Sequence, residues 1–546
     1  MSITKPPCDE AVIENTSGIK PCISKSEPWI LAATILGSSM AFIDGTVVNV
    51  ALPILQKDLH ASVADVQWIV ESYALFLSAL ILVGGSLGDR LGRRRIFAIG
   101  IALFTLASLC CGLASNVTLL IIARAVQGIG GALLVPGSLA IIGASFSPEK
   151  RGRAIGTWSG FTSITAAIGP VLGGWLVQYA NWRWVFFINV PFAIVVLTLL
   201  FWHVPESRDE EADHRLDWWG AGLVTAGLGT LVYGLIEAGQ VGFGDPMVVS
   251  FLILGILLLI AFVIVETRVH APMLPLSLFR SRNFSGANAL TLLLYAAAGG
   301  ALFFFPFNLV QVQHYSPTAA GAAMLPFILI MFLLSRWSGG LVNRFGSRLP
   351  LIIGPVIAAV GYVLYAIPGI GTGESSYWFT YFPAVIVLGL GMAITAAPLT
   401  TTVMGSVATH QAGVASGVNN AVARTAGLLA IAILGIVMAT TFNSNLDQSL
   451  AAVHATPALQ QVIDAQRTKL VAIEIPPDVS IDVATSLRQG INESFIAGFR
   501  VVMLTAAGLA LASALMAALL IEGKASGSIK SPTQEEKTSS EVGLGD

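Results

Sequence analysis

Five ionisable side chains lie inside long apolar stretches of this 546-residue chain, where burying charge is costly and usually serves a function. They are Asp44, Glu71, Arg124, Arg336 and Arg424. Asp44 is a candidate proton carrier, because burial favours its protonated form, a neighbouring Arg124 favours the carboxylate, and a change of exposure would alter the balance. The alternative is a permanent ion pair between Asp44 and Arg124 that only fixes two helices.

The remaining three have less specific interpretations. Glu71 is either a second protonatable or substrate-facing carboxylate or a group hydrogen-bonded near the outer surface. Arg424 either binds helix carbonyl groups or attracts an anionic part of a substrate, and Arg336 would extend toward the cytoplasm. The rise of a helix places Asp44, Glu71 and Arg124 in the same half of a bilayer, so these three could meet.

The composition requires a membrane around these residues. Hydrophobic residues make up 55% of the chain and charged residues 11%, against about 25% charged in an average soluble domain. The net charge of −2 and the scattered basic residues argue against a nucleic-acid binder. The four cysteines lack metal-binding spacing, no GxxxxGKS/T phosphate loop occurs, and the histidines fall in loops or at a span end. We therefore expect an integral membrane protein that is not an enzyme, with no catalytic residues, metal or cofactor.

Fourteen apolar runs reach the roughly 20 residues needed to cross the hydrocarbon core. The predicted spans cover 29–55, 65–88, 94–114, 117–145, 152–179, 182–204, 217–238, 246–266, 284–312, 317–342, 349–368, 377–403, 411–442 and 495–522. The polar first 28 residues lack the pattern of a cleaved signal peptide. The predicted inner loops hold fourteen Lys and Arg residues and the short outer loops two. This predicts a multi-pass protein of the cytoplasmic (inner or plasma) membrane with both termini in the cytoplasm.

An internal repeat divides the spans. Residues 85–94 (GSLGDRLGRR) align without gaps with residues 339–348 (GGLVNRFGSR), at an offset of 254 positions. We therefore expect an all-α membrane protein of two pseudo-symmetric six-helix bundles with an inserted pair, a 6+2+6 arrangement. The predicted segments are a cytoplasmic tail (1–28), a bundle (29–204), the inserted pair with its flanking loops (205–283), a bundle (284–522) with an external loop (443–494), and a disordered tail (523–546).

Five stretches of sequence carry a family resemblance. They are IDGTVVNVALP at 43–53, the loop at 85–95, RAVQGIGG at 124–131, GPVLGG at 169–174 and WRWVFFINVP at 182–191. All five lie in the first bundle, and the chain over 29–522 resembles the fourteen-helix drug:proton antiporters of the major facilitator superfamily. The resemblance implies the major facilitator fold with 14 transmembrane helices.

The resemblance also implies roles for two motifs. The gating motif comprises Gly85, Asp89, Arg90, Gly92, Arg93 and Arg94. Asp89 would help to latch the bundles in an outward-facing state, and the alternative is that the arginines only set the topology. The antiporter motif comprises Gly169, Pro170, Gly173 and Gly174. It suits a bent helix packed closely on a neighbour, and the alternative is a glycine-rich contact without a mechanism.

The function expected from these features is proton-coupled export of amphipathic drugs or toxic small molecules by alternating access. The predicted proton-coupling residues are Asp44, Arg124 and Glu71. The predicted substrate cavity includes Asp44, Glu71, Asn49, Gln127 and Arg424. A dedicated exporter of one metabolite, antibiotic or lipid-like acid is the alternative on the same fold. The expected partners are the substrate, protons and the lipid bilayer, and a periplasmic adaptor protein stays an open alternative.

Overall fold

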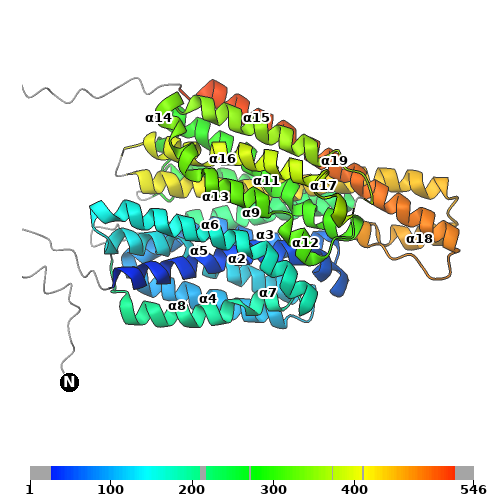
Figure 1. The fold of residues 1–546 in the computed structure, drawn as a ribbon, viewed down its shortest axis with the longest axis horizontal. Coiled ribbons are helices and arrows are strands. Elements are labelled where there is room, and N and C mark those ends of the chain that lie inside the picture. Colours follow the sequence, from blue (N-terminus) through cyan, green and yellow to red (C-terminus); the bar gives the residue numbers. More distant parts are fainter. Residues whose placement is uncertain (1–25, 209–216, 270–271, 372, 409–410, 523–546) are drawn as a thin grey trace, which may run out of the picture.

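The computed structural model describes residues 26–208, 217–269, 272–371, 373–408 and 411–522. The described residues form helices and connecting turns, with no strand among them. The long helices run roughly along one axis of the molecule, and the two halves of the chain occupy its two sides (Figure 1). The predicted tails at 1–28 and 523–546 lie outside the described residues, apart from the start of the first helix at Glu27.

The N-terminal bundle contains the first six predicted spans. Its helices are α2 (Glu27–Asp58), α3 (Val63–Leu91), α4 (Arg93–Leu113), α5 (Val117–Ser145), α6 (Pro148–Tyr179), α7 (Trp184–Phe187) and α8 (Asn189–His203). Side chains cap the exposed amides where the chain re-enters a helix. Ser62 and Asp65 form a reciprocal capping box at α3, and Asn116 caps α5 by accepting from the Leu119 N–H.

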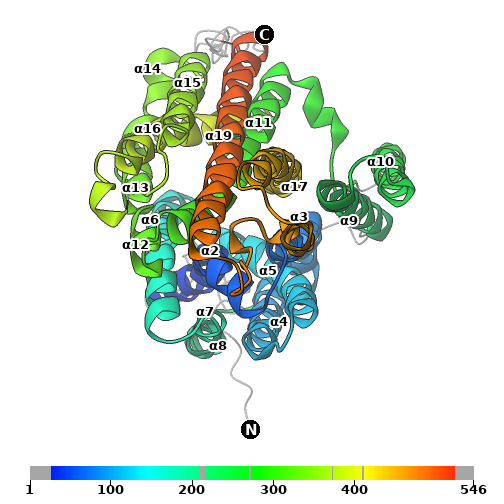
Figure 2. The same cartoon turned by 90° about the vertical axis from the view of Figure 1, so that its right-hand side faces the viewer.

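The inserted pair consists of α9 (Trp218–Val241) and α10 (Pro246–Glu266), with caps from Asp217 and Asp245. Figure 2 places it at the edge of the molecule. Helix α9 packs on α3 of the first bundle and on α17 of the second, whereas α10 packs mainly on α9. Most of α10 is apolar and exposed, as expected for a helix that faces lipid.

The C-terminal bundle contains the last six predicted spans. It runs through η1 (Leu276–Arg280), α11 (Arg282–Phe307), the π-helical turn η2 (Asn308–Val312), α12 (Pro317–Ala322), α13 (Leu325–Gly339), α14 (Leu341–Phe345), α15 (Arg348–Tyr365), η3 (Glu374–Ser376), α16 (Tyr381–Gly405), α17 (Ala412–Ala452), α18 (Pro457–Asp464), η5 (Arg467–Ala472) and α19 (Ile481–Leu520). The loop repeat at 339–348 falls on α14 and the turns around it.

Every predicted span coincides with a helix or with a helix interrupted by a turn. Thirteen helical segments of the described chain are long and apolar enough to cross a membrane, so the count of fourteen spans stays a prediction. Much of the segment expected to be an external loop over 443–494 is helical, because α17 continues to Ala452 and α19 begins at Ile481. Leu450 and Leu487 are buried there with Leu459 and Ile463 of α18, so packing outside the spans extends both helices.

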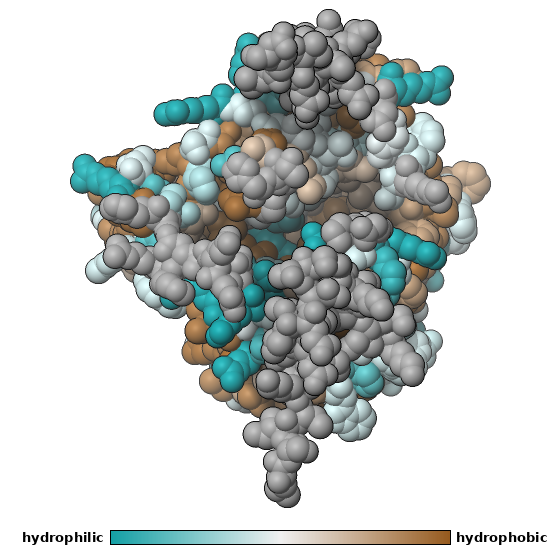
Figure 3. Space-filling view, turned by 90° about the vertical axis from the view of Figure 1, so that its left-hand side faces the viewer, coloured by the Kyte–Doolittle hydropathy of each residue, from teal (hydrophilic) through white to brown (hydrophobic). Residues whose placement is uncertain are grey.

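The two ends of the molecule differ. One end, which we call the hairpin end, carries the segment 453–480 with α18 and η5, and the bundles meet there. The other, the arginine-rich end, carries the loop 90–95, the start of α2 and the end of α19. Toward this end a Cβ on Gly156 of α6 would meet nothing within 4 Å, and one on Gly160 would lie 4.0 Å from Phe332 of α13. Hydrophilic residues surround a recess between the bundles on this face (Figure 3).

Candidate transport site

A buried polar network occupies the core of the N-terminal bundle. Arg124 Nη1 of α5 lies 2.5 Å from Asp44 Oδ2 of α2, and Gln127 Nε2 donates to Asp44 Oδ1 at 2.8 Å. Asn189 of α8 donates to the same oxygen at 3.4 Å. The four side chains are at most 1% exposed. The predicted meeting of Asp44 with Arg124 is therefore present, and the buried pair is neutral overall.

Further contacts hold the Arg124 guanidinium in place. Its Nε donates to the Ile69 carbonyl oxygen at 3.1 Å, and its charge lies 4.3 Å from the centre of the Tyr73 ring. Asn189 is in turn held by Ser108 Oγ at 2.9 Å. Tyr73, Ser108 and Asn189 are not among the site residues predicted from the sequence. Asn189 was nevertheless visible as a polar residue inside the WRWVFFINVP stretch.

Glu71 does not join this network. It lies on α3 with no exposed surface, and neither carboxyl oxygen has a hydrogen-bond partner among the described residues. The Tyr73 side chain lies against Arg124, and Glu71, two residues earlier on α3, therefore lies on another side of the helix. The spacing along the chain allowed the three ionisable residues to meet, but the rotation of α3 separates Glu71 from the other two.

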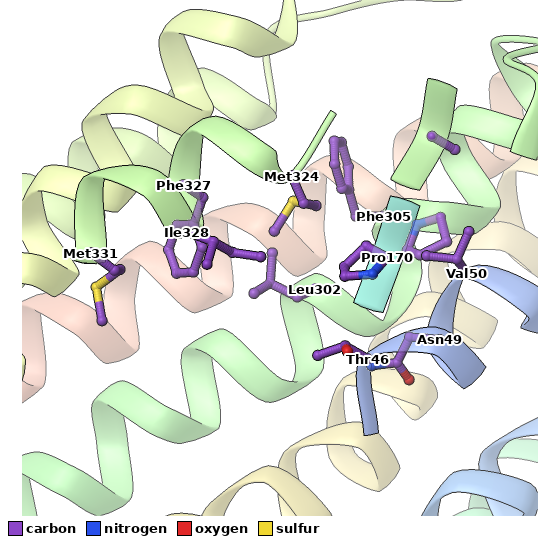
Figure 4. A pocket seen from close by; sticks show the side chains of 12 residues that line it. Thr46, Asn49, Val50, Pro170, Leu302, Phe305, Met324, Phe327, Ile328 and Met331 are labelled. Atoms are coloured by element: carbon purple, nitrogen blue, oxygen red, sulfur yellow. The ribbon is translucent and has the colours of Figure 1, made fainter. Parts of the chain in front are cut away.

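An apolar cavity of about 360 Å³ lies between the two bundles (Figure 4). It is lined by Thr46, Asn49, Val50, Pro170, Leu302, Phe305, Pro306, Ala320, Met324, Phe327, Ile328 and Met331. Of the residues predicted to form the substrate cavity, Asn49 lines this one, while Asp44, Glu71, Gln127 and Arg424 do not. The lining contains no ionisable side chain, so polar recognition in this cavity rests on Thr46 and Asn49.

The antiporter motif forms two close helix contacts. Gly169 and Gly173 of α6 pack on α2, where a Cβ on Gly173 would lie 2.9 Å from the Val47 carbonyl oxygen. On its other side α6 meets the second bundle, since a Cβ on Gly174 would collide with Pro317 and one on Gly321 would collide with Pro170. Small residues allow such backbone contacts. The motif thus lies between α2 and the seam that closes the hairpin end.

Asp89, Arg93 and Arg94 of the gating motif make contacts within the motif and with the segment that follows α8. Arg93 Nε donates to Asp89 Oδ1 at 2.8 Å, and Gly92 turns the chain with φ of +111°. The Arg94 N–H donates to Glu206 Oε1 at 2.9 Å, and Arg93 N–H to the Ser207 carbonyl oxygen at 2.8 Å. Glu206 is not among the residues predicted from the sequence to belong to the gate. The described contacts of Asp89 do not reach the other bundle, so its role as a latch in another state stays a prediction.

Two helical bundles that enclose an apolar cavity, with a buried ion pair beside it, define the class of membrane transporters. The family assignment follows from comparison with known proteins. Residues 34–432 match the model of the Major Facilitator Superfamily, and the chain belongs to this family.

Curated relatives cover three quarters of the chain or more. The tetracenomycin C resistance and export protein of Streptomyces glaucescens is 33% identical over 95% of this chain and 96% of its own. The multidrug resistance protein Stp of Mycobacterium tuberculosis is 33% identical over 89% of this chain and 90% of its own. The puromycin resistance protein of Streptomyces alboniger is 37% identical over 75% and 81%.

Solved structures support the fold. A bacterial homolog of the human lysosomal transporter Spinster, in an inward-facing and unoccupied conformation, aligns with a TM-score of 0.62. The alignment covers 90% of this chain and 98% of that one at 18% sequence identity. At this identity the likeness concerns the fold alone.

Proposed function

We propose that this protein exports amphipathic drugs across the cytoplasmic membrane in exchange for protons. The observation that carries the proposal is the placement of α2, which belongs both to the buried network and to the cavity. Asp44 lies in the network, and Thr46, Asn49 and Val50 line the cavity within two turns of the same helix. A change in the protonation of Asp44 alters its bonds to Arg124 and Gln127, and a movement of α2 transmits that change to a bound substrate.

The arginine-rich end would face the cytoplasm, because Lys and Arg accumulate in cytoplasmic loops. In this orientation the structure corresponds to an inward-facing state. Its outer side, the hairpin end, is closed by the contacts of Gly174 with Pro317 and of Gly321 with Pro170. Transport to the outward-facing state requires those contacts to open and the arginine-rich end to close. The α6 motif contacts both α2 and the second bundle, so it can link the proton site to this movement.

The energetics are sufficient for export. One proton moving down about 100 mV releases about 2.3 kcal/mol, and each tenfold gradient costs about 1.4 kcal/mol. One proton could therefore sustain a gradient of roughly 50-fold for a neutral substrate. The names of the curated relatives support drugs and antibiotics as the substrates. The uncharged cavity lining favours neutral amphipathic compounds among them.

The test uses inverted membrane vesicles with an imposed proton gradient and a pH-sensitive dye. A panel of lipophilic cations, neutral compounds and anions is added to vesicles with the unmodified protein, Asp44→Asn or Asp482→Asn. Asp482 is an exposed aspartate at the start of α19 and serves as the matched control. We expect several unrelated compounds to dissipate the gradient with the unmodified protein and the control, and none with Asp44→Asn. A response to one compound only would indicate a dedicated exporter, and a folded protein with no response would contradict proton exchange.

A further inference from the structure

Two unpaired charges lie on opposite bundles. Glu71 of α3 is fully buried, with both carboxyl oxygens unpartnered among the described residues. Arg424 of α17 is half-buried and interacts electrostatically with Tyr73 of α3, but it forms no ion pair or hydrogen bond with any described residue. An uncompensated charge inside a membrane protein is costly, so both residues would gain from a partner in another conformation.

The faces of α3 and α17 that contain these residues are turned toward each other. Gln67 Nε2 of α3 donates to the Ile431 carbonyl oxygen of α17 at 3.0 Å, and a Cβ on Gly417 would lie 3.1 Å from Leu82 Cδ2. Positions 67, 71, 75, 78 and 82 share one face of α3, and positions 417, 424, 428 and 435 share one face of α17. Glu71 and Arg424 therefore lie on the two facing stripes.

The two charges are separated along the helix axes. Because α3 and α17 run antiparallel, the contacts put position 67 opposite positions 431–435 and position 82 opposite position 417. Arg424 then lies opposite about position 76, some five residues or roughly 7–8 Å from Glu71. A relative movement of about one helical turn, together with the length of an arginine side chain, would bring them together.

The inserted pair encloses this seam. Leu228 and Val232 of α9 belong to the same buried cluster as Leu75 of α3 and Leu428 of α17. Lipid and water are thereby kept from Glu71, and a pair formed in such surroundings is stronger than one in water.

Apart from Tyr73, the other charged or titratable groups on elements packed against α3 are engaged elsewhere or distant from this seam. Arg124 is paired with Asp44 on another face, and Tyr233 and Glu237 of α9 line a small cavity on the α10 side. Tyr73 stacks on Arg124 and also interacts electrostatically with Arg424. The remaining groups are at the two ends of the molecule: Arg467 and Lys469 on η5, and Arg93, Arg94 and Arg95 on α4.

We propose that Glu71 and Arg424 form an ion pair between the bundles in the outward-facing state, and that protonation of Glu71 breaks the pair for the return to the state described here. The proposal rests on the proposed function, because it assumes alternating access driven by protons. A proton taken up from outside neutralises the Glu71 carboxylate and frees Arg424 from it. The bundles can then return without separating two opposite charges.

The test measures the outward-facing population with spin labels at Ala180 and Ile370, exposed positions at the hairpin end of the two bundles. The four natural cysteines are replaced by serine. At alkaline pH, Glu71→Gln and Arg424→Gln should each lower the outward-facing population about tenfold. The double variant Glu71→Gln/Arg424→Gln should have an outward-facing population no lower than that of either single variant, because both changes remove the same interaction. Arg500→Gln, an exposed arginine bonded to the Ala366 carbonyl oxygen, is the control and should have no effect.

The charge reversal Glu71→Arg/Arg424→Glu should restore most of the outward-facing population. Additive losses in the double variant, or a folded charge-reversed protein without recovery, would overturn the pairing. An Arg424→Gln variant that no longer transports anionic substrates, but whose spin-label distances are unchanged, would also overturn the pairing. Arg424 would then be a residue that binds substrate. Loss of coupling in Asp44→Asn is measured separately, so a failed pairing leaves the proposed function intact. An unmodified protein without proton coupling would instead remove the proposed function itself.

Discussion

Gly174 of α6 and Pro317 of α12 meet so closely at the hairpin end that a Cβ on Gly174 would collide with the Pro317 carbonyl group. The reciprocal contact, Gly321 against Pro170, lies one turn away on the same two helices. These contacts join the two bundles through backbone atoms alone. Closure of this end thus depends on residues without side chains.

Gly174→Ala should prevent full closure of the hairpin end and lower transport about tenfold or more. The matched control is Gly156→Ala on the same helix, where a Cβ meets nothing within 4 Å. Substrate efflux from cells and the accessibility of a cysteine placed at Gln178 measure the effect. Equal transport by the two variants would show that the seam tolerates a side chain.

Arg124→Gln should destabilise the protein by about 3–5 kcal/mol, because it leaves the Asp44 carboxylate buried without its cation. The double variant Asp44→Asn/Arg124→Gln should recover part of this loss, since no uncompensated charge remains. Thermal unfolding in detergent measures both. A double variant that is less stable than Arg124→Gln would argue against a charge-pair origin of the effect.

Met331→Ala should weaken substrate binding by about 1–2 kcal/mol, because the methionine contributes apolar surface to the cavity. Leu333→Ala, two residues along α13 and 69% exposed, removes a similar side chain from the outer surface. The Kd of a fluorescent substrate should rise about 5- to 30-fold for the first variant and stay unchanged for the second. Similar values for both would place substrate elsewhere.

Asp89→Asn should lower the turnover of transport more than it weakens substrate binding. The carboxylate binds Arg93 in this state, and a latch formed in the other state would lose the same charge. Transport rate and substrate Kd, measured on one preparation, separate the two effects. Unchanged turnover would contradict the latch and leave the arginines with topology alone.

The sequence by itself determined residence in a membrane and the approximate positions of the long helices, and it indicated that Asp44 and Arg124 could meet. Apolar runs of this length have one stable environment, and buried opposite charges have few other ways to be compensated. The glycines of the α6 motif also indicated close packing, because small residues in a helix rarely serve another purpose inside a membrane.

Only the tertiary structure decided which groups face one another. The rotation of α3 separates Glu71 from Asp44, and it depends on contacts with α5, α17 and α9 that no local pattern records. The cavity gathers side chains from α2, α6, α11, α12 and α13, so its uncharged lining is a property of the packed bundles. The extension of α17 to Ala452 has the same origin, because its polar turns are stabilised by residues of a distant hairpin.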